Sequence, residues 1–104
     1  MAYIAKVTLT NTWTKLEDLI KAIDGLSTFA FDTSKQYSIQ VDTVNQNHDY
    51  SGYFCHSATE PTESDAGEHL DNKLFAVYEP VLGVDMWVKA ASTAGKIKVS
   101  VSEI

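Results

Sequence analysis

The sequence predicts an all-β protein, an antiparallel two-sheet sandwich of about seven strands with one short helix. Three observations favour this fold. Several short segments alternate apolar and polar residues with a period of two, these segments recur roughly every ten residues, and only one stretch has a helical period. A small closed β-barrel would give the same pattern and is the alternative. With 104 residues, the chain is expected to form a single β-sandwich domain, residues 1–104.

The clearest alternation lies near the C-terminus and predicts a β-hairpin. One arm is expected near Val84–Ser92, the turn over Ser92–Gly95 and the return arm near Lys96–Ser102. Gly95 can take the positive φ that a short hairpin turn often needs. Since a hairpin alone is marginal in water, its dry face should pack against the rest of the chain. That face would carry Met86, Val88, Ala90, Ile97, Val99 and Val101.

The one helix is expected near Lys15–Ile23, plugging an open end or edge of a sheet. Thr14 and Glu17 have the spacing of a capping box, in which each side chain accepts a hydrogen bond from the other residue's backbone N–H. Gly25 stands where a left-handed C-cap is expected. Trp13 is interpreted as a packing residue, and the alternative is an exposed Trp used in binding. The apolar stripe of the helix comprises Leu16, Leu19, Ile20 and Ile23.

The remaining strands follow from the same alternation. Tyr3–Thr10 should place Val7 and Leu9 inward. Four further strands are expected, namely Ser27–Phe31, Gln36–Thr43, Tyr50–Ser57 and Leu74–Tyr78. The sequence leaves open which face of Tyr50–Ser57 is buried. Glu79–Gly83 is expected to bend the chain into the final hairpin, while Val44–Asp49 and Ala58–Lys73 are interpreted as polar loops.

Composition limits the function classes. Eight Lys and Arg residues against fourteen Asp and Glu residues give a net charge of −6, which disfavours nucleic acid as a partner. The apolar runs are too short to cross a membrane, so no membrane partner is expected. The single Cys55 excludes an intramolecular disulfide, and the first ten residues lack the features of a secretory signal. Synthesis and folding in a reducing cytoplasm are therefore expected.

No residue constellation predicts a chemistry, so no catalytic, cofactor-binding or metal site is assigned and the protein is not expected to be an enzyme. Phosphate-binding glycine loops, nucleophile elbows and zinc-protease motifs are missing. Cys55 and His56 are adjacent in an expected strand and point to opposite faces, which excludes a catalytic dyad. His48, Asp49 and His56 could hold a metal only if the loop folds back. Three acidic residues close in sequence could suggest a calcium site but do not fit the EF-hand pattern; they are Asp65, Glu68 and Asp71.

Aromatic residues make up 11% of the chain, which is more than a small core needs. Four of them are candidates for a contact surface with a sugar or another protein, because they combine apolar area with a polar group. The alternative is that they are ordinary core and cross-strand aromatics. The candidates are Tyr50, Tyr53, Tyr78 and Trp87.

The C-terminal sequence resembles a known group of proteins. Trp87–Gly95 followed by Lys96–Glu103 looks like the terminal hairpin of small virion structural proteins of tailed bacteriophages, such as head decoration proteins and head fibres. The polar segment Pro61–Leu70 followed by Leu74–Tyr78 is also similar to that group. The resemblance covers about the last 45 residues.

This resemblance implies a capsid decoration or cement protein that binds the assembled head and stabilises it. Its partners would be the major capsid protein or other virion proteins and further copies of itself as a homo-oligomer, and its location would be the virion. The alternative is a carbohydrate- or receptor-binding module of a virion fibre that uses Trp87 or the tyrosines. A small enzyme ranks below both.

Overall fold

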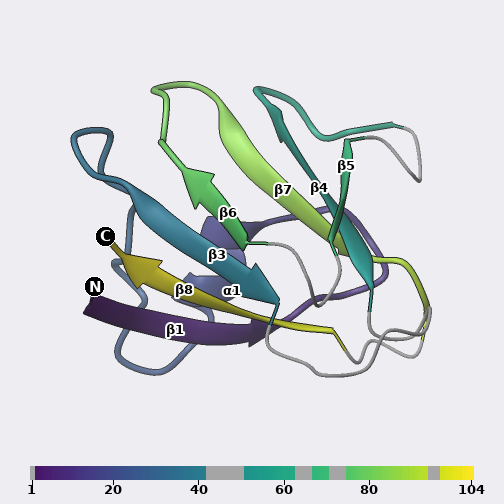
Figure 1. Ribbon diagram of the computed structural model, residues 1–104, viewed down its shortest axis with the longest axis horizontal. Helices are drawn as coiled ribbons and strands as arrows, with labels where there is room; N and C mark the ends of the chain where they lie inside the picture. The colour runs from purple at the N-terminus through teal and green to yellow at the C-terminus, as the bar shows by residue number, and fades with distance from the viewer. Residues whose placement is uncertain (1, 42–50, 63–66, 71–74, 94–96) are drawn as a thin grey trace.

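The chain folds into two antiparallel β-sheets packed face to face, as a computed structural model shows (Figure 1). The structure describes residues 2–41, 51–62, 67–70, 75–93 and 97–104, with side chains left out at 69, 70, 75 and 76. The helix is α1 (Leu16–Lys21), and the strands are β1 (Ala2–Thr8), β2 (Thr14–Lys15), β3 (Tyr37–Val41), β4 (Gly52–Ser57), β5 (Glu68–Leu70), β6 (Phe75–Tyr78), β7 (Asp85–Ala90) and β8 (Lys98–Glu103).

The first sheet has the strand order β1-β8-β3-β6, and the second sheet has the order β2-β7-β4-β5. In Figure 1 the first sheet lies in front on the left and the second on the right, with both chain ends at the left. The sheets do not close into a barrel, so the sandwich prediction is confirmed and the barrel alternative is wrong.

The core lies between the inner faces of the two sheets, and the two-residue alternation decides which side chains enter it. In β8, Val99 and Val101 have no exposed surface, whereas Lys98, on the opposite face of the strand, is exposed to solvent. The same alternation buries three residues of β7 and three of β3. These are Met86, Val88 and Ala90 in β7, and Tyr37, Ile39 and Val41 in β3.

Strand β1 interrupts its alternation with a bulge. Tyr3 pairs with Ser102 and Ala5 pairs with Val101, so Ile4 is an extra residue between two consecutive partners on β8. Ala5 is buried and Ile4 packs against the core, while Tyr3 remains 66% exposed. The bulge therefore turns Tyr3 out of the core face on which strict alternation would place it.

The C-terminal segments form the two expected strands, but the hairpin prediction is wrong. Strand β7 pairs with β2 and β4, whereas β8 pairs with β1 and β3 in the other sheet. The chain changes layers after Ala90: the N–H of Ala91 still donates to Ser51 of the second sheet, while the carbonyl of Ile97 accepts from Leu9. Because β7 and β8 lie in opposite layers, their dry faces enter one shared core from two sides, which a flat hairpin does not achieve. Of the expected turn Ser92–Gly95, residues 94 and 95 lie outside the described residues, as does residue 96 at the start of the expected return arm.

Helix α1 confirms the predicted apolar stripe but not its predicted caps. Leu16 and Ile20 are fully buried, and α1 packs against β1, β2 and β7. The N-cap is Lys15, without a side-chain hydrogen bond, and the C-cap is Ala22 in a right-handed conformation. The capping box fails because Glu17 instead accepts the N–H of Phe31, 2.9 Å away. Gly25 has φ +87° in the turn that follows the helix.

The other strand predictions agree with the structure except at three places, the first being the unpredicted short strand β2 at Thr14–Lys15. Ser27–Phe31 is not a strand, because the N–H of Phe29 donates locally to Leu26 and that of Phe31 to Glu17. Inside the polar segment Ala58–Lys73, Glu68–Leu70 forms the short strand β5 against β4. The expected loop at 44–49 lies outside the described residues.

The sandwich has two open sides, which differ. On the helix side, α1 fills the space between β1 of one sheet and β2 and β7 of the other. On the turn side, β6 is the edge of the first sheet and faces β4 of the second, where the rings of Tyr78 and His56 stack with centroids 5.4 Å apart. The connection from β6 to β7 crosses the upper end of the strands in Figure 1, and its turn lines a hollow together with Lys15 and Glu17.

Candidate binding surface

The connection between β6 and β7 is a tight turn that presents an apolar side chain at its tip. The N–H of Val84 donates to the carbonyl of Val81 at 3.0 Å, and Gly83 has φ +82°. A positive φ at the third of four residues, closed by this hydrogen bond, is the pattern of a type II turn with Leu82 at its second position. Leu82 is 91% exposed, so the turn holds this side chain out in solvent.

Two more apolar side chains are exposed beside Leu82. Val81 is 61% exposed, and Val77 on β6 is 52% exposed. Val77 and Val81 line one hollow, and Val81 and Leu82 line an adjoining one, so Val81 connects the other two residues. We call Val77, Val81 and Leu82 the apolar turn surface. Adjoining exposed apolar side chains are typical of sites where proteins meet.

The hollow beside the apolar turn surface has a volume of about 310 Å³. Its polar groups are His56, stacked on Tyr78, and Glu79, which accepts a hydrogen bond from the Gln36 amide at 2.8 Å. Its lining is otherwise apolar side chains of the edge strand and the turn. This composition fits an apolar side chain of a partner, with one polar contact at the rim.

The wall behind the hollow is built from aromatic rings that contact one another. Phe31 contacts both Tyr37 and Tyr78 edge to face, with ring centroids 4.8 and 4.9 Å apart. Burial, with a smaller contribution from the negative charges of Asp85 and Glu17, raises the pKa of Tyr78 to about 12. Tyr78 is therefore a neutral phenol at physiological pH and has no role as a base.

The contact surface predicted from the aromatic residues does not form as a unit. Tyr78 is 5% exposed and Trp87 is 8% exposed, so both belong to the packed interior and their prediction as surface residues is wrong. Tyr53 is half-buried, with the Lys89 ammonium 5.9 Å from its ring centroid. Tyr50 lies outside the described residues.

Trp87 and Trp13 are both packing residues. The indole N–H of Trp87 donates to the carbonyl of Ser57 at 3.1 Å, and the Lys15 ammonium lies 5.6 Å from its ring centroid. These contacts explain how Trp87 is buried although it lies on the face of β7 opposite Met86 and Val88. Trp13 is buried as well, which confirms its interpretation as a packing residue.

The residues weighed for nucleophilic or metal chemistry do not converge in the described part of the chain. Burial raises the pKa of the Cys55 thiol, which keeps it protonated. His56 lies on the same face of β4 as Phe54, with ring centroids 6.0 Å apart. Among the described residues no group of three or more His, Cys, Asp or Glu side chains could hold a metal ion. His48, Asp49, Asp65 and Asp71 lie outside those residues, and Glu68 is on β5.

Sequence reasoning placed a bend at Glu79–Gly83 but did not assign Val81 and Leu82 to a site. A signal was present: two consecutive large apolar residues stand between Pro80 and Gly83, in a segment too short to be a strand. A tight turn has few neighbours that could cover such side chains, so apolar residues there are exposed unless another molecule covers them.

Within the described residues, no helix has the length and apolar character that spanning a bilayer requires. No protein family, curated protein or solved structure matches the chain.

Proposed function

We propose that the protein is a virion structural protein that binds the assembled head of a bacteriophage and stabilises it, using the apolar turn surface to dock on the major capsid protein. The observation that carries the docking step is Leu82, held 91% exposed at the tip of a hydrogen-bonded turn. Burying one leucine side chain stabilises a complex by roughly 2 kcal/mol. Because the turn is already closed in the free protein, little conformational entropy is lost on docking.

The virion assignment is supported by the resemblance of Trp87–Gly95 and Lys96–Glu103 to phage decoration and head-fibre proteins. Those segments contribute β7 and β8, which lie in different sheets, so the resemblance rests on sequence and not on a shared hairpin. A head offers many equivalent binding sites, and a modest contact repeated at each of them adds up over the shell. A homo-oligomer on the head would multiply the contacts further.

The alternative is a carbohydrate- or receptor-binding module, and two of the aromatic residues predicted to serve it are not available. Tyr78 and Trp87 are buried and cannot serve as stacking platforms for a sugar. Tyr53 alone is accessible among the described candidates. A sugar site on this protein therefore needs other residues.

Co-sedimentation with empty heads tests the proposal. The heads are assembled from the major capsid protein encoded nearest to this chain's gene, and the pelleted fraction is measured against protein concentration. We expect the unchanged protein to pellet with the heads and Leu82→Asp to bind at least about tenfold more weakly, the effect of losing about 1.4 kcal/mol. Thr8→Asp adds the same charge at an exposed position of β1 and should bind normally.

Two results would count against the proposal. Absence of the unchanged protein from the pellet would overturn the virion function. Equal pelleting of Leu82→Asp and Thr8→Asp would leave the virion function standing but would remove the apolar turn surface as its docking site.

A further inference from the structure

A second hollow, with a different chemistry, lies where β1, β8 and the segment before β3 meet. It has a volume of about 440 Å³, within the range of roughly 300–1,000 Å³ that is usual for small-molecule sites. Ile4, Leu26 and Phe29 give it an apolar wall, and all three pack against the core. Tyr3 lines the same hollow and is 66% exposed, so its ring is accessible to a ligand.

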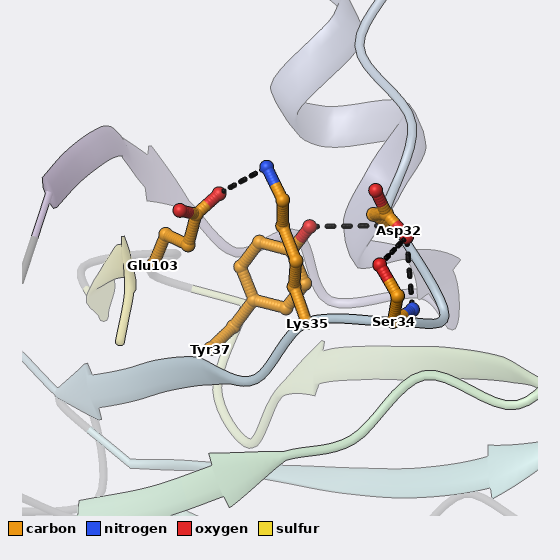
Figure 2. A network of polar contacts seen from close by, with 5 residues as sticks. All are labelled: Asp32, Ser34, Lys35, Tyr37 and Glu103. Carbon is orange, nitrogen blue, oxygen red and sulfur yellow. Dashed lines mark hydrogen bonds and ion pairs between the residues drawn. The ribbon is translucent and has the colours of Figure 1, made fainter.

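The polar side of the hollow is a connected set of groups, which Figure 2 shows from close by. The Lys35 ammonium contacts a carboxylate oxygen of Glu103 at 2.9 Å. One carboxylate oxygen of Asp32, Oδ1, accepts from the backbone N–H of Ser34 at 2.8 Å and from its hydroxyl at 2.6 Å. The Tyr37 hydroxyl accepts from the backbone N–H of Asp32 at 2.9 Å. These contacts hold the groups in place before any ligand arrives.

Each of these groups keeps hydrogen-bonding capacity. Asp32 and Glu103 each have a second carboxylate oxygen that makes no contact within this set, as Figure 2 shows, and Lys35 has further N–H donors. The Tyr37 side chain is almost fully buried, and its hydroxyl accepts one bond while its own proton finds no acceptor among the described residues. Bonding to Ser34 lowers the pKa of Asp32, and bonding to Glu103 raises the pKa of Lys35, so both are charged at neutral pH.

We propose that this hollow binds a neutral saccharide, with one face of the sugar on the Tyr3 ring and its hydroxyls on Asp32, Lys35 and Glu103. A sugar hydroxyl both donates and accepts, so it can use carboxylate oxygens and ammonium N–H groups at once. Two carboxylates against one ammonium disfavour an anion. A purely apolar ligand would bury these charged groups without replacing their water. The site shares no residue with the apolar turn surface and goes beyond docking on a head.

A ¹H–¹⁵N NMR titration tests the proposal with methyl glycosides of glucose, galactose, mannose and N-acetylglucosamine. Each sugar is raised to about 50 mM, which detects dissociation constants in the millimolar range. We expect at least one sugar to shift the backbone amides of Tyr3, Lys35 and Glu103. Tyr3→Ala should then weaken its binding about tenfold by removing the stacking surface, and Asp32→Asn should weaken it severalfold by removing a charged acceptor.

Tyr53→Ala is the matched control, because it removes another accessible tyrosine on the second sheet and should leave sugar binding unchanged. Leu82→Asp should also bind the sugar normally, which separates this site from the docking surface. The proposal is overturned if none of the four sugars shifts these amides, if the shifts map to Tyr53 instead, or if Tyr3→Ala binds like the unchanged protein.

Discussion

The two open sides of the sandwich differ in how completely their apolar side chains are buried. On the helix side, Leu16 and Ile20 enter the space between the sheets and are fully buried. On the turn side, Val77, Val81 and Leu82 remain exposed although the residues behind them are packed. Both sides place apolar side chains beside an open edge, and only one of them covers those side chains with its own chain.

The difference follows from the length of chain available at each side. Between β1 and β3 the chain has enough residues to form β2, α1 and a further segment that carries Phe29 and Phe31 to the core. Between β6 and β7 it has only Glu79–Val84, closed into a turn. The helix side therefore buries its apolar side chains in the core, and the turn side leaves its apolar surface exposed.

The largest expected effect tests whether the helix side carries stability. Ile20→Ala should lower the free energy of unfolding by about 2–5 kcal/mol, because it removes buried methylene and methyl groups and leaves a cavity. Leu82→Ala, an apolar truncation on the turn side, should change it by less than about 0.5 kcal/mol. Urea unfolding of both variants provides the measurement. Similar losses for the two variants would break the comparison between the sides.

The pH dependence of stability tests the burial of Tyr78, which lies in the aromatic wall on the turn side. The pKa of Tyr78 is about 12 in the folded protein, above the ordinary value of 10.0. Its stabilising contribution is thus complete below pH 10 and is lost as the pH rises toward 12. The loss is at most about 3 kcal/mol. Tyr78→Phe should remove this part of the pH dependence in urea unfolding, and Tyr53→Phe should retain it; identical profiles would contradict the assignment.

Glu17 tests how the helix side is joined to the segment after it. Glu17→Ala should cost about 1–2 kcal/mol, because the N–H of Phe31 loses a charged acceptor. Amide hydrogen exchange should become faster at Phe31 in this variant. Thr14→Ala should leave Phe31 protected, since Thr14 bonds to Thr12 and Thr10 instead. Faster exchange at the first turn of α1 and not at Phe31 would indicate that Glu17 caps the helix instead.

The smallest effect compares a glycine from each side. Gly25 follows α1 with φ +87°, and Gly83 lies in the turn with φ +82°, and an added Cβ would meet no atom within 4 Å at either. Alanine at either position should therefore cost about 1 kcal/mol from backbone conformation alone. Asparagine, which tolerates this conformation better, should cost less at both. A loss at Gly83→Ala well above that at Gly25→Ala would indicate that the turn also supports the core.

Much of the fold could be predicted from local pattern. Alternation predicts the inward faces of β1, β7 and β8, and the apolar stripe predicts the buried face of α1. Alternation failed at Tyr3, where a bulge adds one residue. Phe29 and Phe31 share a face without forming a strand, because the N–H of Phe29 donates to Leu26 and that of Phe31 to the Glu17 carboxylate.

The candidate surfaces were much less predictable. Tyr78 and Trp87 were predicted from residue type, yet exposure depends on what packs over a side chain and not on the side chain itself. The bend at Glu79–Gly83 could be placed from Pro80 and Gly83. The exposure of Leu82 could not, because it depends on whether other parts of the folded chain cover the turn. The hollow proposed to bind a saccharide is lined by Tyr3, Lys35 and Glu103, which lie too far apart in the sequence for a local pattern to group them.

By itself the sequence determined which face of β1, β7 and β8 is turned to the core, since the two-residue period is a local property of extended backbone. Tertiary structure decided which strands pair and in which layer they lie. The backbone groups that pair strands are the same in every residue, so partners are selected by the mutual burial of whole faces. For that reason β7 and β8, consecutive strands in the chain, lie in opposite sheets, and the dry faces of both enter the shared core.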